Sequence, residues 1–249
     1  MANPFSLEGR RILVTGASSG IGRACAVMAS KLGAGVILTG RRAEALEETL
    51  SFCEGTGHLV VPGDISLSGF VIELAEKSGK IDGLIHAAGI APMCPVGMLS
   101  QEQWDCVMRI NCYAFFELMK HYSKKKFRSD NFSAVAISSV SAYAGWAGGI
   151  AYCGSKGALS SSIRALAMEL SSKGIRVNAV CPSNIRTPLY EAGASDMNDE
   201  ESLKELLKKQ PLGLGEPEQV AWPVCFLLSD AASFITGVNL PVDGGYLAQ

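Results

Sequence analysis

Tyr152 and Lys156 stand four residues apart in the stretch AYCGSKGAL, which is followed by a run of good helix formers. On an α-helix, residues i and i+4 lie on the same face, one turn apart. A tyrosine normally loses its proton near pH 10, and a neighbouring positive charge lowers that pKa. The spacing therefore predicts a phenol that donates a proton and an ammonium group that tunes it. Two residues on an ordinary helix surface are the alternative.

Short apolar runs alternate with helical patterns along the chain, and these elements must position the pair. The runs that we interpret as strands cover residues 11–15, 35–39, 58–61, 81–86, 133–138, 175–180 and 238–241. Helical patterns cover residues 21–32, 43–52, 67–77, 101–127, 152–171 and 218–228. Continuously apolar strands that alternate with helices indicate a parallel sheet covered on both faces. We therefore predict an α/β fold: one domain over residues 1–249, a doubly wound Rossmann-like parallel sheet with helices on both faces.

The composition argues against several classes of function. A formal net charge of −2 gives no reason to expect nucleic acid or an acidic membrane surface as a partner. The 8 cysteines form no CxxC pair and no cluster with histidine at metal-ligand spacing, so we expect no metal and a reducing compartment. No apolar run approaches the ~18 residues of a membrane span, and the N-terminus has no signal-peptide core. We therefore expect a cytoplasmic protein.

A glycine-rich loop, TGASSGIG at residues 15–22, follows the first predicted strand. Ligands of doubly wound folds bind at the carboxyl ends of the strands, which is where this loop lies. Glycines let the backbone turn tightly and approach a ligand, and the helix that begins here offers free N–H groups to a pyrophosphate. Glycines that serve only the packing of a tight turn are the alternative. The loop predicts a dinucleotide cofactor that contacts Gly16, Ser18, Ser19, Ile21 and Gly22.

The residues after the second and third strands bear on which dinucleotide binds. NAD-specific sites usually place an acid after the second strand, whereas this chain has Gly40, Arg41 and Arg42. An arginine fork suits the 2′-phosphate of NADP, so the pair favours NADP(H) over NAD(H); two solvated arginines are the alternative. After the third strand, Asp64, with Ile65 beside it, either reaches the adenine or caps the helix that follows.

Together these motifs resemble the short-chain dehydrogenase/reductase family over essentially the whole chain. TGASSGIG matches the TGxxxGxG pattern of that family, and Tyr152 with Lys156 matches its YxxxK pair. Ser139, at the end of the fifth predicted strand, and Asn111, in a helix, stand where the family has its catalytic serine and asparagine. The resemblance implies that Tyr152 donates a proton to a carbonyl held by Ser139. It also implies that Lys156 binds the nicotinamide ribose and lowers the pKa of Tyr152, and that Asn111 anchors a water linking Lys156 to solvent.

The resemblance also places cofactor contacts after the fourth and sixth strands. The implied contacts are Ala87, Gly89, Pro182, Ile185 and Thr187. Two positions depart from the family pattern. His86 and Ala87 replace two asparagines, and His86 either bridges the sheet or is an ordinary buried histidine. Ser183 replaces a glycine in the loop CPSNIRTP.

The substrate is not evident from the sequence. The charged segment 189–210 resembles the substrate lid of the family, and the length and ending of the chain most resemble 3-oxoacyl-carrier-protein reductases and their relatives. The resemblance implies an NADP(H)-dependent enzyme that reduces a carbonyl of a small molecule or an acyl thioester to a hydroxyl, as a homotetramer or a dimer. A sugar, polyol or steroid dehydrogenase of the same family, and a non-catalytic dinucleotide sensor, are the alternatives.

Overall fold

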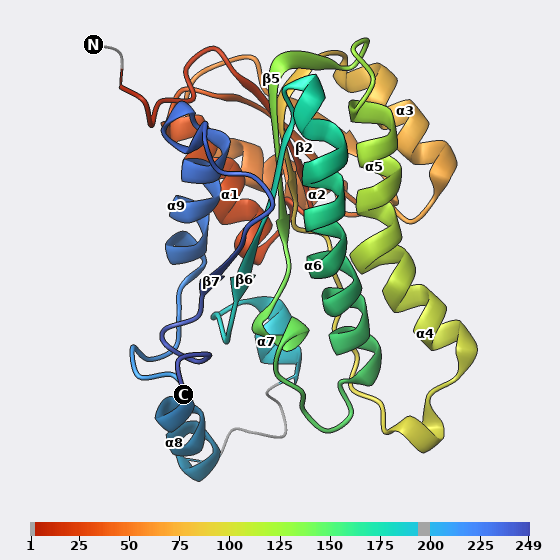
Figure 1. The fold of residues 1–249 in the computed structure, drawn as a ribbon, viewed down its shortest axis with the longest axis vertical. Helices are drawn as coiled ribbons and strands as arrows, with labels where there is room; N and C mark the ends of the chain where they lie inside the picture. The colour runs from red at the N-terminus through yellow and green to blue at the C-terminus, as the bar shows by residue number, and fades with distance from the viewer. Residues whose placement is uncertain (1–2, 194–199) are drawn as a thin grey trace.

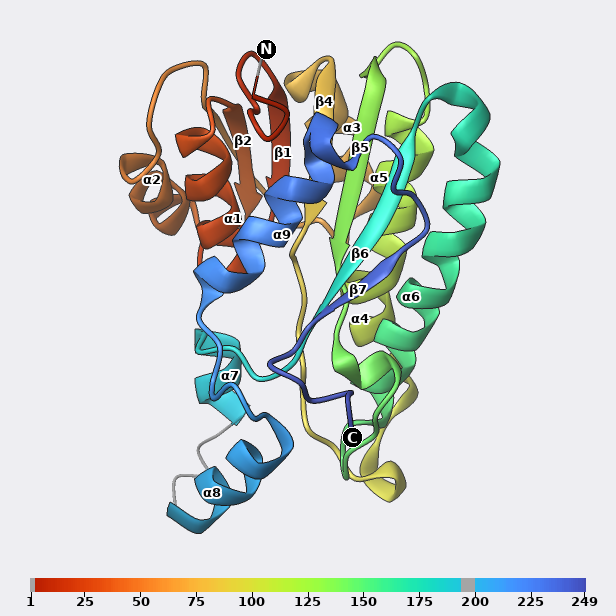
Figure 2. The same cartoon turned by 60° about the vertical axis from the view of Figure 1, so that its left-hand side comes forward.

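A seven-stranded parallel sheet forms the centre of the computed structural model, which describes residues 3–193 and 200–249. The strands are β1 (Arg11–Thr15), β2 (Gly35–Gly40), β3 (Leu59–Pro62), β4 (Ile81–His86), β5 (Arg128–Ile137), β6 (Arg176–Pro182) and β7 (Asn239–Val242). Their order is β3-β2-β1-β4-β5-β6-β7, so the chain runs outward from β1 to one edge and then from β4 to the other. This order confirms the predicted doubly wound fold (Figures 1 and 2).

Helices cover both faces of the sheet. One face carries α1 (Gly20–Lys31), α2 (Ala43–Ser51) and α9 (Pro217–Leu228), and the other carries α3 (Ser68–Ser78), α4 (Gln101–Met108), α5 (Ala114–Tyr122) and α6 (Ile150–Leu170). Two further helices, α7 (Pro188–Gly193) and α8 (Glu200–Lys209), lie beyond the carboxyl ends of the strands (Figures 1 and 2). Among the described residues, none of these helices has the length and apolarity to cross a membrane.

The central strands are largely apolar because they face two cores. In β1, Leu13 packs into the core beneath α3, α5 and α6, whereas Ile12 and Val14 pack into the core beneath α1 and α9. All three side chains have no exposed surface. Alternate residues of one strand thus contribute to opposite cores, as a parallel sheet covered on both faces requires.

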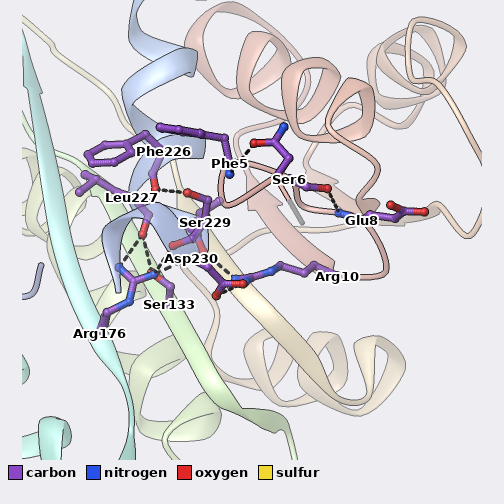
Figure 3. A network of polar contacts seen from close by, with 12 residues as sticks. Phe5, Ser6, Glu8, Arg10, Ser133, Arg176, Phe226, Leu227, Ser229 and Asp230 are labelled. Carbon is purple, nitrogen blue, oxygen red and sulfur yellow. Dashed lines mark hydrogen bonds and ion pairs between the residues drawn. The ribbon is translucent and has the colours of Figure 1, made fainter. Parts of the chain in front are cut away.

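Two arginines at the amino ends of β1 and β6, Arg10 and Arg176, bind the C-terminal end of α9 (Figure 3). Arg10 donates to the carbonyl of Leu228 at 2.8 Å and pairs with Asp230 at 2.5 Å. Arg176 donates to the carbonyl of Leu227 at 2.7 Å, and burial lowers its pKa to about 10. Cations stabilise the free carbonyls at a helix C-terminus. These contacts therefore hold the C-terminal end of α9 against the amino ends of β1 and β6, away from the glycine-rich loop.

Two predicted boundaries are wrong, and both have a physical reason. The helical pattern 101–127 is not one helix: a π-helical segment, Arg109–Tyr113, separates α4 from α5, and α5 ends at Tyr122. The fifth strand was predicted to start at residue 133, whereas β5 starts at Arg128. Arg128 pairs with Ile81, and pairing resumes only at Ser133 opposite Gly83, so an irregular segment precedes the apolar run that the pattern detects.

Candidate active site

A cavity of about 1350 Å³ lies at the carboxyl ends of the strands. It brings together all predicted site residues except Asn111, although they come from loops spread over most of the chain. The predicted residues that line it are Gly16, Ser18, Ser19, Ile21, Gly22, Arg41, Arg42, Asp64, Ile65, Ala87, Gly89, Ser139, Tyr152, Lys156, Pro182, Ile185 and Thr187.

The glycine-rich loop is packed so tightly that side chains would not fit. A Cβ atom on Gly16 would lie 2.7 Å from the main-chain nitrogen of Ala88, and the φ of +65° at Gly16 already disfavours any other residue. A Cβ atom on Gly22 would lie 2.2 Å from the carbonyl oxygen of Gly16. Helix α1 starts here without a side-chain cap and without an acidic residue in its first turn. Its free N–H groups and positive dipole end therefore fit a pyrophosphate.

Arg41 and Arg42, which follow β2, line the cavity and are exposed. Arg42 donates to the hydroxyl of Ser18 at 3.3 Å, which directs its guanidinium toward the glycine-rich loop. Asp64 accepts from the main-chain N–H of Ser66 at 2.9 Å, so it does cap the turn before α3 while it also faces the cavity. Partial burial raises the pKa of Asp64, but the hydrogen bonds from Ser66 and the charge of Arg41 outweigh this effect and lower the pKa.

His86 bridges the sheet, which confirms the first of the two alternatives. Its Nδ1 lies 3.0 Å from the hydroxyl of Thr15, the residue opposite it on β1. That hydroxyl also accepts from the N–H groups of Ala87 and Ala88, both at 3.2 Å. Its own proton is therefore directed to Nδ1, which leaves the histidine proton on Nε2. Burial and the charge of Lys156 lower the pKa of His86 to about 3, so the ring is neutral.

The hydroxyl of Ser139, and not that of Ser138, is available to the cavity. Ser138 is turned into the interior, where its hydroxyl lies 2.6 Å from that of Ser160 and 3.3 Å from the carbonyl oxygen of Lys156. Ser139 follows β5 in an extended conformation, accepts from the N–H of Ser141 at 3.0 Å, and lines the cavity together with Tyr152. The structure thus supports the choice of Ser139 that spacing alone had suggested.

The pair Tyr152–Lys156 lies on α6, at the base of the cavity. The ammonium of Lys156 donates to the carbonyl of Ile137 at 2.7 Å and lies 5.6 Å from the centre of the Tyr152 ring. Burial raises the pKa of Tyr152, and the hydrogen bond from Ser139 offsets this only in part. Burial also lowers the pKa of Lys156, to about 8. On balance the pKa of Tyr152 is thus raised by burial, and the lowering by Lys156 that the family resemblance implies stays a prediction.

Asn111 lies behind the cavity wall, in the π-helical segment Arg109–Tyr113. Its amide accepts from the N–H of Ile90 and donates to the Ile90 carbonyl, both at 2.9 Å, and it donates to the hydroxyl of Ser155 at 3.0 Å. The buried side chain thus ties the loop after β4 to the helix that carries Tyr152. Such an interruption of an α-helix often marks a functional position.

The loop after β6 lines the cavity beside the glycine-rich loop. The hydroxyl of Thr187 accepts from the N–H of Tyr190 at 3.2 Å, and its methyl group would lie 3.2 Å from a Cβ atom on Gly20. The hydroxyl of Ser183 is buried in the cavity wall and has no hydrogen-bond partner among the described residues. An unsatisfied buried hydroxyl at this position fits a polar group of a bound molecule.

The outer end of the cavity contains residues from several segments. Trp146 donates to the hydroxyl of Ser141 at 3.3 Å, and its ring centre lies 6.3 Å from that of Tyr152. The predicted lid contributes residues of α7 and α8, including Glu205 and Lys209, while its residues 194–199 lie outside the described part of the chain. Sequence reasoning missed Met93 and Tyr246 as lining residues. The consecutive glycines before Tyr246, both with positive φ, were the available signal for a chain reversal there.

Within residues 3–193 and 200–249, no group of three or more histidine, cysteine, aspartate or glutamate side chains is arranged to hold a metal ion. Near α6 the polar groups of the cavity are hydroxyls, the half-buried phenol of Tyr152 and the buried amine of Lys156, while guanidinium and carboxylate groups line other parts of it. Such a set can hydrogen-bond a dinucleotide and exchange one proton with a bound carbonyl or alcohol.

Comparison with known proteins agrees with this chemistry. Residues 16–247 match a family model for short-chain alcohol dehydrogenases that is described as enoyl-(acyl carrier protein) reductase. The chain is 33% identical over 246 residues to the 3-oxoacyl-[acyl-carrier-protein] reductase FabG of Thermotoga maritima, covering 96% of this chain and 98% of the relative. It is also 33% identical over 248 residues to the L-rhamnose 1-dehydrogenase (NAD(P)(+)) of a Sphingomonas species, covering 96% of each protein.

Among solved structures, a protein of Agrobacterium tumefaciens provisionally assigned as a 2-deoxy-D-gluconate 3-dehydrogenase, with bound NADP, superposes with a TM-score of 0.89. Its sequence is 34% identical, and 100% of each chain is covered. The matches span the glycine-rich loop, the Tyr152–Lys156 pair and the C-terminal strand together. The chain therefore belongs to the short-chain dehydrogenase/reductase family of oxidoreductases, which act on carbonyl and hydroxyl groups.

Proposed function

We propose that the protein is an NADP(H)-dependent reductase that converts a carbonyl to a hydroxyl. The observation that carries the proposal is a single cavity that Tyr152 and Ser139 line together with Arg41 and Arg42. Tyr152 and Ser139 would act on the substrate carbonyl, and the two arginines would hold the 2′-phosphate of the cofactor.

The raised pKa of Tyr152 suits the direction of carbonyl reduction. Because burial disfavours the phenolate, the phenol keeps its proton at neutral pH and is a donor. Ser139, through its hydroxyl, would orient the substrate carbonyl toward that proton. As negative charge develops on the substrate oxygen, the proton moves from the Tyr152 oxygen to it, and the charge of Lys156 stabilises the tyrosinate that remains. Asn111 would keep a water path to Lys156, through which the proton is replaced.

The cofactor would lie along the residues that fit it. Its pyrophosphate fits the uncapped start of α1, with Gly16, Ser18, Ser19, Ile21 and Gly22 in contact, and Asp64 with Ile65 would lie beside the adenine. Ala87, Gly89, Pro182, Ile185 and Thr187 would surround the nicotinamide half. When bound, NADPH supplies the hydride that reduces the carbonyl carbon.

Two classes of substrate are supported by the relatives. The similarity to FabG of Thermotoga maritima favours a 3-oxoacyl thioester, whereas the similarity to an L-rhamnose 1-dehydrogenase favours a sugar. We propose the acyl thioester first, in a cytoplasmic homotetramer or dimer that pairs α4, α5 and α6 of neighbouring copies. A non-catalytic sensor is disfavoured because sensing a dinucleotide requires no proton donor, and Ser139, Tyr152 and Lys156 are all present in the cavity.

The test is NADPH oxidation, followed by absorbance, with a panel of 3-oxoacyl thioesters, diketones and sugars. Turnover with at least one carbonyl compound is expected, with NADPH preferred to NADH. Arg41→Ala should reduce the NADPH/NADH preference about tenfold or more, since it removes a charged partner of the 2′-phosphate. Tight NADPH binding without turnover of any compound would indicate the sensor, and an unchanged preference in Arg41→Ala would contradict the NADP assignment.

A further inference from the structure

Gln210, directly after α8, makes an unusually complete set of hydrogen bonds for a residue at the end of a surface helix. Its side chain is only 2% exposed. Its Oε1 accepts from the main-chain N–H and from the side-chain amide of Asn184, both at 3.3 Å. Its Nε2 donates to the carbonyl oxygens of Asn184 at 3.1 Å and of Gly213 at 2.6 Å. The amide of Gln210 therefore pairs with both main-chain groups of Asn184, as a neighbouring strand would.

This contact joins two segments that line the same cavity. Asn184 lies in the loop after β6, and that loop carries Ile185 and Thr187 at the nicotinamide end. On the other side, α8 leads directly into Gln210 and contributes Glu205 and Lys209 to the outer end of the cavity. A displacement of the Gln210 amide would thus move both walls of the cavity together.

The chain around the contact leaves little room for another arrangement. A Cβ atom on Gly244 would lie 2.9 Å from the Cγ atom of Gln210, so the C-terminal loop is in close contact with this side chain. The carbonyl of Lys209 accepts from the side chain of Gln249 at 2.6 Å, and Gly215 donates to the Asn184 carbonyl at 3.1 Å. Gln210 is therefore fixed between three segments that meet only in the folded protein.

We propose that Gln210 is a positioning residue that holds α8 and the loop after β6 as one unit, and so sets the nicotinamide end and the substrate end of the cavity relative to each other. This inference rests on the proposed function. Among side chains of this length only glutamine has both an amide donor and an amide acceptor. Methionine keeps the approximate volume and loses all of these bonds, whereas glutamate keeps the acceptor and loses the donors.

The test compares two ligands that depend on different ends of the cavity. NADPH spans the whole cavity, and 2′,5′-ADP carries only the adenosine half with its 2′-phosphate, which would bind at Arg41 and Arg42. For Gln210→Met we expect the Kd of NADPH, measured by its fluorescence, to rise about tenfold. A tenfold change in Kd corresponds to about the net free energy of one hydrogen bond. The Kd of 2′,5′-ADP, measured by calorimetry, should stay within about twofold.

Gln101→Met is the matched control, because Gln101 is exposed on α4 and its side chain bonds Asp105 of the same helix. It should change neither Kd. Gln210→Glu is the second variant, in case the methionine variant does not fold; it should also weaken NADPH by about threefold or more while 2′,5′-ADP binding is retained. With the most active compound of the carbonyl panel, the KM should rise in both Gln210 variants.

Three results separate the possible failures. An unchanged NADPH Kd in both Gln210 variants would overturn the positioning role. Equal weakening of NADPH and 2′,5′-ADP would also overturn it, since it would show that Gln210 serves the stability of the whole fold. If the unmodified protein binds neither ligand, the proposed function itself is wrong, irrespective of Gln210.

Discussion

His86 should contribute to a loss of stability in acid. The ring of His86, at the end of β4, is buried and hydrogen-bonded through Nδ1 to Thr15 of β1. Burial and the charge of Lys156 lower its pKa from 6.5 to about 3. Because the unfolded chain then binds more protons than the folded one, stability is lost as the pH falls from about 6.5 to about 3.

The size of the effect follows from the two pKa values. Between pH 7.5 and pH 5.0, the unfolded histidine gains nearly a full proton while the folded one gains almost none. Integrated over this interval, the difference in bound protons is equivalent to one proton over about 1.5 pH units. One proton over one pH unit corresponds to about 1.4 kcal/mol. His86 alone should therefore remove about 2 kcal/mol of the free energy of unfolding over this interval, a large share of the stability of a typical domain.

The assay is urea unfolding of the native protein and of His86→Asn at both pH values and at one protein concentration. Asparagine is chosen because it does not titrate and still offers a hydrogen-bond partner to Thr15. The other acidic and histidine groups are common to both proteins, so the difference between them isolates His86. The native protein should lose about 2 kcal/mol more than His86→Asn. Equal losses would show that the ring titrates normally and would refute the reasoning.

Two further predictions concern the cofactor site. NADPH binding should weaken at high pH, because the pKa of Lys156 is about 8 and only the charged form binds well: the Kd measured by calorimetry should rise up to about eightfold between pH 7.5 and pH 9.0, whereas a flat profile would contradict the role of Lys156. Gly22→Ala should lose about 1–3 kcal/mol in urea unfolding, because its Cβ atom would lie 2.2 Å from the Gly16 carbonyl. The matched variant Gly69→Ala, exposed in α3 with nothing within 4 Å, should gain about 0.5–1 kcal/mol, and equal stability of the two variants would contradict the packing argument.

Most of the fold could be predicted because the central strands are buried on both faces. That burial produces continuous apolar runs such as Ile12, Leu13 and Val14, and parallel pairing with right-handed crossovers then restricts the topology. What could not be predicted depends on contacts between distant segments. The early start of β5 at Arg128 comes from pairing with Ile81, and the π-helical segment around Asn111 comes from packing against Ile90 and Ser155.

The candidate site also combines features that the sequence predicts with features that it does not predict. Motifs that act through the local backbone, such as the glycine-rich loop and the Tyr152–Lys156 spacing, are visible in the sequence and converge in the structure. The direction of the Tyr152 pKa is not visible, because it depends on how deeply the phenol is buried. The contact between Gln210 and Asn184 is not visible either, since 26 residues separate the two and only the folded chain brings them together.

The central claim is that the phenol of Tyr152 supplies the proton for carbonyl reduction, and Tyr152→Phe tests it most directly. Phenylalanine keeps the ring that packs near Trp146 and removes only the hydroxyl. The measurement is kcat for reduction of the most active compound of the panel, with the Kd of NADPH measured on the same preparation. The account predicts that kcat falls at least about a hundredfold while the Kd changes less than about twofold. Full turnover in Tyr152→Phe would contradict it.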